Sequence, residues 1–369
     1  MNLRHVLPGA ALCAAALSAG CASPRAPVAG NPNGAEGQRG EGLVLQADEG
    51  ERRVRRPRPG STTAQTAPFI LKVDPRNGAS RELVMGYEEI APGEAIQPHR
   101  HLVADEIVFV HRGSGVATLG AREAPVSAGA TVYIPRDTRI ALRNTGPEPL
   151  GIAFIFSKPG FEELMRENSV LEGQPATPLA AEQQAAIRAR HRWHTVAEGA
   201  GAEPGPPGSG GLVLHAGEGE RRVRRPRPGS ASTLTDPFIL KVDRCNGGST
   251  ELVMGYEDLA PGQAINPHRH LLADEIIFVH RGSGVATLGT RETPVSAGGT
   301  VYIPRGSRIS LRNTGAGPLG IAFVFSRPGF EELMRENSVP EGEPAPPLSP
   351  EEFAAIRARH RSHTVYDPQ

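Results

Sequence analysis

The chain has 369 residues, of which 40 are basic and 40 acidic, so its formal net charge at neutral pH is zero. That balance gives no argument for nucleic acid or a charged membrane surface as a partner. At about 150 residues per domain, the length predicts two domains, each long enough to bury a hydrophobic core.

The N-terminal segment has the pattern of an export signal. Arg4 gives a short basic start, and the stretch from Val6 to Gly20 is apolar but too short to span a bilayer. It ends in LSAGC, which resembles a bacterial lipobox, and in that motif the cysteine, here Cys21, is lipidated. We therefore expect a signal peptide over residues 1–20. Cleavage at a nearby small residue, which gives a soluble exported protein, is the alternative.

Residues 21–41 are rich in Pro, Gly and Ala and have almost no bulky apolar side chains. Such a segment cannot bury enough surface to fold, so we expect a disordered tether. Together these features predict a protein of the cell envelope, either lipid-anchored or periplasmic, that touches a membrane only through its lipid. Of three cysteines only Cys245 lies beyond residue 21, so the sequence predicts no disulfide framework.

The remainder of the chain is a duplication. Residues 42–196 and 211–366 repeat each other at one constant offset, and the segment 197–210, AEGAGAEPGPPGSG, reads as a linker. Because this offset is longer than the periods of solenoid repeats, it indicates two copies of a whole domain.

Within each copy, most segments read as short strands. In the first copy GLVLQ, PFILKVD and ELVMGYE come before residue 93, and GVATLG, TVYIP, RIALRN and GIAFIF come after residue 113. Gly, Pro and Asn separate them at the spacing of an all-β barrel or sandwich. The strand after Glu106 is apolar on both faces, so we expect it to be buried on both sides. Each copy ends in two helical patterns, PGFEELMRENS and AAEQQAAIRARHR in the first, which we expect outside the barrel.

The candidate metal-binding residues lie in residues 93–113, GEAIQPHRHLVADEIVFVHRG. On a strand, His99 and His101 point to the same face, and Glu106 opens the next strand after a short connection. A hairpin here would bring the carboxylate beside both imidazoles, which makes three sides of a site for a divalent metal ion. The second copy repeats the trio as His268, His270 and Glu275.

This stretch resembles the first motif of the cupin family, Gly-x5-His-x-His-x4-Glu-x6-Gly. Both copies fit every fixed position, from Gly93 to Gly113 and from Gly262 to Gly282. The resemblance implies a jelly-roll β-barrel in each copy, and a bicupin whose two barrels pack as an intramolecular pseudo-dimer. The family's second motif, Gly-x5-Pro-x-Gly-x2-His-x3-Asn, is present but altered. Its histidine, the family's usual fourth ligand, is Ile140 in one copy and Ile309 in the other, and Asp137 replaces a glycine.

Three functions remain open from these residues. Three ligands with open positions would suit Fe, Mn, Zn, Ni or Cu and a dioxygenase-like oxidoreductase that acts on a small molecule. Alternatively the metal sites have decayed, and the barrel mouths bind a sugar or small acid without catalysis. An envelope scaffold with inactive barrels is a third option.

Other residues have competing interpretations. By strand parity His111 and His280 lie on the face opposite the ligands. His191 and His194, like His360 and His363, could hold a metal, but we favour charged side chains at a helix C-terminus. Gln97 and Asn266 share the ligand face and could supply an amide oxygen. The run ERRVRRPRPG, at 51–60 and 220–229, could bind an anion, although a solvated edge strand is the interpretation we favour.

Overall fold

The computed structural model describes residues 42–57, 67–78, 80–198, 210–228 and 236–367. The predicted signal peptide, Cys21 and the tether lie outside the described residues. Among the helices that the structure does describe, none has the length and apolar character needed to cross a bilayer.

The first copy is built from strands with two short helices near its end. The strands are β1 (Leu43–Leu45), β2 (Glu51–Arg55), β3 (Phe69–Val73), β4 (Val84–Ile90), β5 (Ala95–His101), β6 (Glu106–Arg112), β7 (Ser114–Leu119), β8 (Arg122–Ser127), β9 (Thr131–Ile134), β10 (Arg139–Asn144), β11 (Leu150–Phe156), β12 (Ser169–Leu171) and β13 (Thr195–Ala197). The helices are α1 (Phe161–Glu167) and α2 (Ala181–His191).

The second copy repeats this order. Its strands are β14 (Leu212–Leu214), β15 (Glu220–Arg224), β16 (Phe238–Val242), β17 (Val253–Leu259), β18 (Ala264–His270), β19 (Glu275–Arg281), β20 (Ser283–Leu288), β21 (Arg291–Ser296), β22 (Thr300–Ile303), β23 (Arg308–Asn313), β24 (Leu319–Phe325), β25 (Ser338–Pro340) and β26 (Thr364–Tyr366). Its helices are α3 (Phe330–Glu336) and α4 (Pro350–His360).

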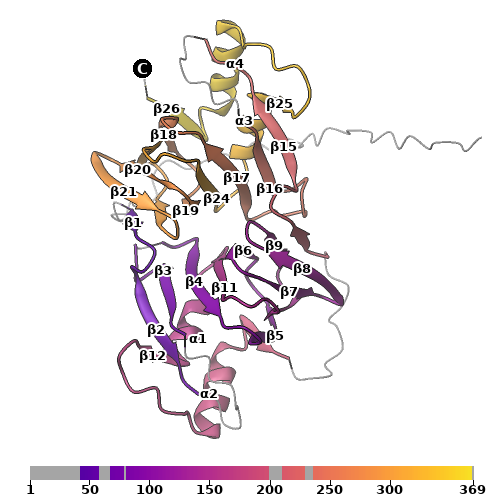
Figure 1. The fold of residues 1–369 in the computed structure, drawn as a ribbon, viewed down its shortest axis with the longest axis vertical. Helices are drawn as coiled ribbons and strands as arrows, with labels where there is room; N and C mark the ends of the chain where they lie inside the picture. The colour runs from indigo at the N-terminus through magenta and orange to yellow at the C-terminus, as the bar shows by residue number, and fades with distance from the viewer. Residues whose placement is uncertain (1–41, 58–66, 79, 199–209, 229–235, 368–369) are drawn as a thin grey trace, which may run out of the picture. The chain divides into compact units, whose positions relative to one another are not determined.

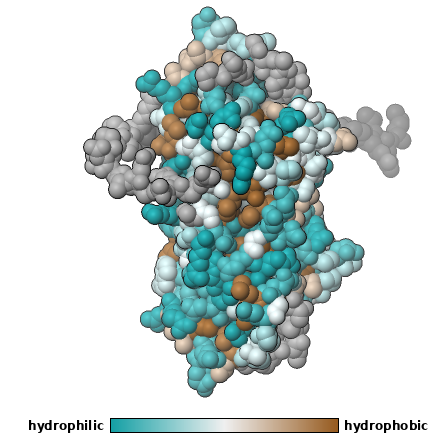
Figure 2. Space-filling view, turned by 90° about the vertical axis from the view of Figure 1, so that its left-hand side faces the viewer, coloured by the Kyte–Doolittle hydropathy of each residue, from teal (hydrophilic) through white to brown (hydrophobic). Residues whose placement is uncertain are grey.

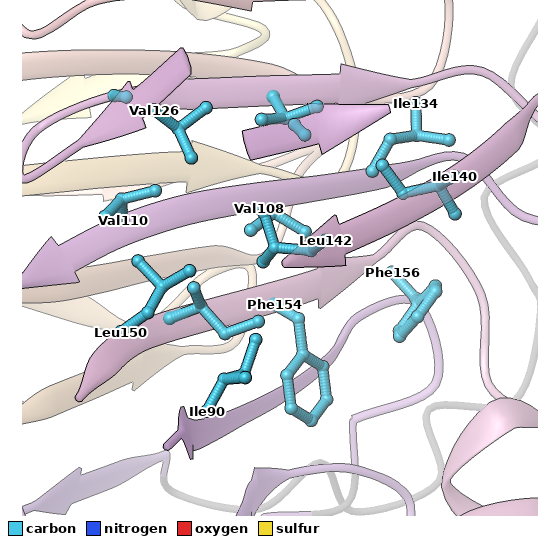
Figure 3. Close-up of a cluster of buried hydrophobic side chains, with 14 of the residues drawn as sticks. Ile90, Val108, Val110, Val126, Ile134, Ile140, Leu142, Leu150, Phe154 and Phe156 are labelled. Carbon is cyan, nitrogen blue, oxygen red and sulfur yellow. The ribbon is translucent and has the colours of Figure 1, made fainter. Parts of the chain in front are cut away.

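Each copy forms a jelly-roll barrel of two antiparallel sheets, which confirms the predicted all-β fold class (Figure 1). Barrel 1 consists of the eight-stranded sheet β12-β2-β3-β4-β11-β6-β9-β14 and the five-stranded sheet β13-β5-β10-β7-β8. Barrel 2 has the equivalent sheets, β25-β15-β16-β17-β24-β19-β22-β1 and β26-β18-β23-β20-β21. Inside barrel 1, side chains such as Val108, Leu142 and Phe154 from both sheets meet in one core (Figure 3).

Strand β6 is buried on both faces, as the sequence predicts. Val108 and Val110 belong to the interior core of barrel 1. Ile107 and Phe109 point the other way into a second cluster, which also contains Phe278 and other residues of barrel 2. A strand that serves two cores needs apolar residues at successive positions, which explains why β6 shows no polar alternation.

The short N-terminal strand of each copy pairs with the eight-stranded sheet of the other copy. β1 pairs with β22, Val44 opposite Val301, and β14 pairs with β9, Val213 opposite Val132. Gly42 precedes the first of these arms at a φ of +87°, and a Cβ there would lie 2.6 Å from the carbonyl oxygen of Tyr302. Glycine is therefore required where the arm enters the other sheet.

Two expectations need correction. β5 and β6 are not a hydrogen-bonded hairpin, because β5 lies in the five-stranded sheet and β6 in the eight-stranded one. The chain crosses from one sheet to the other between them. The first helix is not wholly outside the barrel either, because Met165 belongs to the interior core and Phe161 packs against it.

The surface that Figure 2 draws is largely hydrophilic, and hydrophobic residues gather on it in separate places. Among the described residues the large exposed hydrophobic side chains are Leu171, Trp193, Leu271, Leu272 and Val365. Scattered exposure of this kind is ordinary for a folded protein and does not define a docking surface.

Candidate metal centre

The two sheets of each barrel bring the two histidines and the glutamate together. His99 and His101 come from β5, and Glu106 is the first residue of β6 on the opposing sheet. One ligand atom of each lies within 4.8 Å of the others, and the same holds in barrel 2 for His268, His270 and Glu275. The trio therefore spans the interior from one sheet to the other.

Backbone carbonyls fix the tautomer of the first histidine in each trio. His99 Nδ1 lies 2.8 Å from the carbonyl oxygen of Gln97, and His268 Nδ1 lies 2.8 Å from that of Asn266. Because a carbonyl only accepts, Nδ1 carries the proton and Nε2 presents a lone pair to the site. Gln97 and Asn266 thus act on the histidines through their backbone oxygens.

The second histidine lies closer to the acid. His101 Nε2 is 3.0 Å from His99 Nε2 and 3.4 Å from Glu106 Oε2. The equivalent distances around His270 are 3.0 Å to His268 and 3.4 Å to Glu275. Burial lowers the pKa of His101 and His270 well below 6.5, and the neighbouring histidine adds to the effect. Both imidazoles are therefore neutral, which is the form that binds metals.

The glutamates have an unsatisfied oxygen. Oε2 of Glu106 and Oε2 of Glu275 are buried and have no hydrogen-bond partner. Burial raises the pKa of each carboxyl group to about 8, with a smaller contribution from the carboxylate of Glu88 or Glu257. A buried carboxylate without a partner costs several kcal/mol, and a cation at this point would remove that cost. The donor set of two imidazoles and one carboxylate fits a divalent transition metal.

Isoleucine occupies the place where the resemblance puts a fourth ligand. Ile140 lies opposite His99 in the ladder between β10 and β5, and Ile309 lies opposite His268. Both isoleucines are buried in the barrel cores, and Figure 3 shows Ile140 beside Ile134. An alkyl side chain cannot ligate, so each candidate site offers the three side chains of the trio and no fourth donor at this position.

The turn of the second motif keeps its shape despite Asp137. Its backbone N–H donates to the carbonyl oxygen of His101 at 2.6 Å, as that of Gly306 does to His270. Asp137 has a φ of +61°, in the left-handed region that Asp tolerates better than most residues. The replacement of glycine therefore leaves the turn beside the ligand intact.

A hydrogen-bonded chain leads away from His101. Its Nδ1 lies 3.2 Å from Thr195 Oγ1, which lies 2.8 Å from His194 Nδ1. His194 Nε2 then lies 2.9 Å from His191 Nδ1, and His191 Nε2 lies 3.0 Å from Glu167 Oε1. For His191 and His194 the sequence favoured charged side chains at the end of a helix. That interpretation is wrong for His194, because burial lowers its pKa to about 4.

Barrel 2 keeps both ends of this chain, since His360 Nε2 lies 3.1 Å from Glu336 Oε1, but among the described residues no hydrogen bond joins the side chains of His360 and His363. His270 Nδ1 lies 3.2 Å from Thr364 Oγ1, which lies 2.9 Å from His363 Nδ1. His363 Nε2 is buried without a hydrogen-bond partner. The threonines that contact the ligand histidines escaped prediction, since they belong to no motif. The only signal was a His-Thr pair repeated in both copies.

The repeated basic run is not a solvated edge. β2 lies between β3 and β12, and β15 lies between β16 and β25. Arg55 forms an ion pair with the buried Glu88 in barrel 1. In barrel 2, Arg224 lies 2.5 Å from Glu257, and its guanidinium covers the ring of Phe238 at 4.7 Å.

Barrel 2 contains a cavity of about 170 Å³ that reaches the candidate ligands His268 and Glu275. Its walls are mainly apolar side chains, and three arginines of the basic run stand on its lining. A small molecule in this cavity would lie beside the candidate metal ligands of barrel 2.

Comparison with known proteins agrees with this architecture. A family model described as "Cupin domain" matches residues 86–156 and 255–325. The curated relatives include the dimethylsulfoniopropionate lyase DddW of Ruegeria pomeroyi, 30% identical over 119 residues that cover 29% of this chain and 77% of that one. They also include the tetracenomycin polyketide synthase protein TcmJ of Streptomyces glaucescens, 29% identical over 104 residues, or 27% of this chain and 69% of the relative.

Among solved structures, the oxalate decarboxylase of Lactobacillus farciminis, in complex with formate, has a TM-score of 0.53 and 15% identity over 84% of this chain and 90% of its own. An oxalate decarboxylase variant from Bacillus subtilis also has a TM-score of 0.53, with 14% identity over 88% of this chain and 89% of that one. At such low identity the likeness shows the fold alone. With one cupin domain in each barrel, the chain belongs to the cupin family as a bicupin.

Proposed function

We propose that this protein is a metal-dependent bicupin that binds one divalent transition metal ion in each barrel. The observation that carries the proposal is the buried Oε2 of Glu106 and of Glu275, which has no hydrogen-bond partner and lies beside two histidines in each barrel. His99, His101 and Glu106 would hold the ion in barrel 1, and His268, His270 and Glu275 in barrel 2. Fe, Mn, Zn, Ni and Cu all suit this donor set.

The proposed reaction class is dioxygenase-like oxidation of a small organic molecule. When bound, the ion supplies Lewis acidity and a template for O2 or a chelating substrate. The carbonyls of Gln97 and Asn266 fix the tautomers of His99 and His268, and the side chains of Ile140 and Ile309 offer no donor at the fourth-ligand position. The apolar walls of barrel 2 exclude water from the neighbourhood of the ligands.

We also propose export to the cell envelope, with a lipid on Cys21 and a tether over residues 21–41. The support is the sequence pattern of residues 1–21. In this proposal the lipid is the only membrane contact, the two barrels act as an intramolecular pseudo-dimer, and the partner is a small molecule in a barrel mouth.

A second candidate is a non-catalytic module that binds a sugar or small acid. The isoleucines at the fourth-ligand position favour it, because each removes a donor from the site. Without a metal, a carboxyl group with a pKa of about 8 is protonated at neutral pH, and the buried glutamate then carries no charge.

Metal content separates the two candidates. Residues 22–369 would be purified without a His-tag or added metal and measured by inductively coupled plasma mass spectrometry. We expect near-stoichiometric metal that disappears in the His99→Ala/His268→Ala double variant and persists in His215→Ala, a control at an exposed position. Protein that holds no metal, even after soaking, would reject the metalloenzyme. With metal present, oxygen uptake in the presence of candidate substrates separates the enzyme from a metal-binding module.

A further inference from the structure

The cavity of barrel 2 has the size and walls of a site for a small apolar group. Its volume is about 170 Å³, and its lining includes Ile277, Ile321, Phe323 and Met334. An apolar cavity of about 150 Å³ is large enough to bind benzene. The cavity can therefore hold an aromatic ring or an alkyl chain of about six carbon atoms.

The lining also carries more positive charge than its carboxylates neutralise. Arg224 is paired with Glu257 at 2.5 Å, and Arg225 lies 3.4 Å from Glu352. Among the described residues no carboxylate pairs with Arg227. Its guanidinium instead lies over two aromatic rings, 5.7 Å from the centre of Phe353 and 5.3 Å from that of Tyr366. This half-buried guanidinium is therefore available to pair with an anionic ligand.

Those two rings distinguish barrel 2 from barrel 1. At the repeat offset, Phe353 corresponds to Gln184 and Tyr366 to Ala197. Tyr366 also lines the cavity and lies 5.8 Å, centre to centre, from the ring of His268. The aromatic support for Arg227 therefore stands directly beside a candidate ligand, and the first copy has no aromatic residue at either position.

We propose that barrel 2 binds a small organic monoanion, namely a carboxylate with an apolar body of about six carbons, whose charged end meets Arg227 while the body fills the cavity. A planar guanidinium matches a carboxylate with two parallel hydrogen bonds, and the apolar walls favour the body over water. The inference rests on the proposed function in one respect, that the metal ligands His268 and Glu275 lie at the same cavity.

The test uses two pairs of probes of equal shape, benzoate with benzamide and hexanoate with hexanamide. Each would be titrated calorimetrically at neutral pH into residues 22–369, and the metal content of every sample would be measured. We expect at least one of the two acids to bind at one site per chain, about tenfold to a hundredfold more tightly than its neutral amide. Arg227→Gln should remove the difference in affinity between acid and amide. The Phe353→Gln/Tyr366→Ala variant, which carries the residues of barrel 1 at these two positions, should bind the acid more weakly.

Arg221→Gln serves as the control, because Arg221 belongs to the same basic run but pairs with the exposed Glu341. It should bind the acid as the natural sequence does. Equal binding of acid and amide, unchanged binding in Arg227→Gln, or no binding of either acid would overturn the inference. Metal content reports separately on the proposed function. An acid-selective site in metal-free protein would leave the inference standing while the metal proposal failed.

Discussion

At the scale of single residues, the candidate site depends on the protonation of its buried glutamates and histidines. At neutral pH, burial favours the uncharged forms of Glu106 and Glu275, and it does the same for His101 and His270. Glu106 and Glu275 each lie 3.4 Å from a histidine, and among the described residues neither glutamate forms an ion pair with a lysine or an arginine. The fold therefore tolerates the trio without metal only while the carboxyl groups keep their protons.

This arrangement predicts how the stability of the metal-free protein depends on pH. The folded-state pKa of each glutamate is raised from 4.5 to about 8, so its stabilisation is complete below 4.5 and is lost as pH rises through 8. His268 acts oppositely, since its pKa is lowered from 6.5 to about 4 and its contribution is lost as pH falls below 6.5. Of the glutamates and His268, only the glutamates change the free energy of unfolding between pH 6.5 and 8. The free energy of unfolding should fall there by at most about 1.4 kcal/mol per pH unit for each glutamate.

Denaturant titrations of chelator-treated protein across this interval would measure the slope. The Glu106→Gln/Glu275→Gln variant keeps the shape of both side chains but cannot ionise there, so its free energy of unfolding should not show the fall with pH that the glutamates cause. The slopes are compared between the two proteins, because Lys72 and Lys241, whose pKa values burial lowers to about 8, contribute to both. A slope that is the same in the variant and the natural sequence would show that the glutamates do not titrate there.

At the scale of elements, the sequence predicted most of the strands and both helices of each copy, because period-2 patterns and turn residues are local signals. It also indicated which three side chains meet, because their spacing is that of a known motif. It could not show that β5 and β6 lie in opposing sheets, since strand pairing over long sequence distance leaves no local mark. The contact of Thr195 with His101 escaped for the same reason, as the two residues are 94 positions apart.

The exchanged arm gives a prediction at this scale. Val44 comes from the start of the first copy but packs against the core of barrel 2. Val44→Asp should therefore destabilise barrel 2, by about 2–4 kcal/mol, because a charge would replace a partly buried alkyl group that packs against the core. Hydrogen exchange should quicken at Thr300–Ile303, the strand that pairs with β1.

The equivalent strand of barrel 1, Thr131–Ile134, pairs with β14 and should keep its protection in this variant. Asp48→Ala, at an exposed position just beyond the arm, is the matched control and should change neither strand. Unaltered protection of Thr300–Ile303 in Val44→Asp would contradict a stabilising role for the arm.

At the scale of the whole chain, duplication has made the contact between the barrels nearly symmetrical. One cluster of buried side chains takes Phe109 and Tyr133 from barrel 1 and Phe278 and Tyr302 from barrel 2. His111 and His280 face each other in the same region, with their Nδ1 atoms 3.4 Å apart. Their position opposite the ligand face follows from strand parity, but that this face meets the other barrel could not be deduced from one copy alone.

This symmetry predicts the behaviour of a half-chain. Residues 42–198 alone would expose the apolar face around Phe109, and the arm LVL at 43–45 is identical to that at 212–214, which β9 accepts in the full chain. Two half-chains can therefore reproduce the contact of the two barrels, because arm, accepting strand and apolar face are all present in each. We expect a homodimer by light scattering coupled to size exclusion, and a monomer for Phe109→Asp of the same half-chain with its β-sheet circular dichroism retained. A folded, monomeric half-chain of the natural sequence would show instead that the apolar face does not drive the association of the barrels.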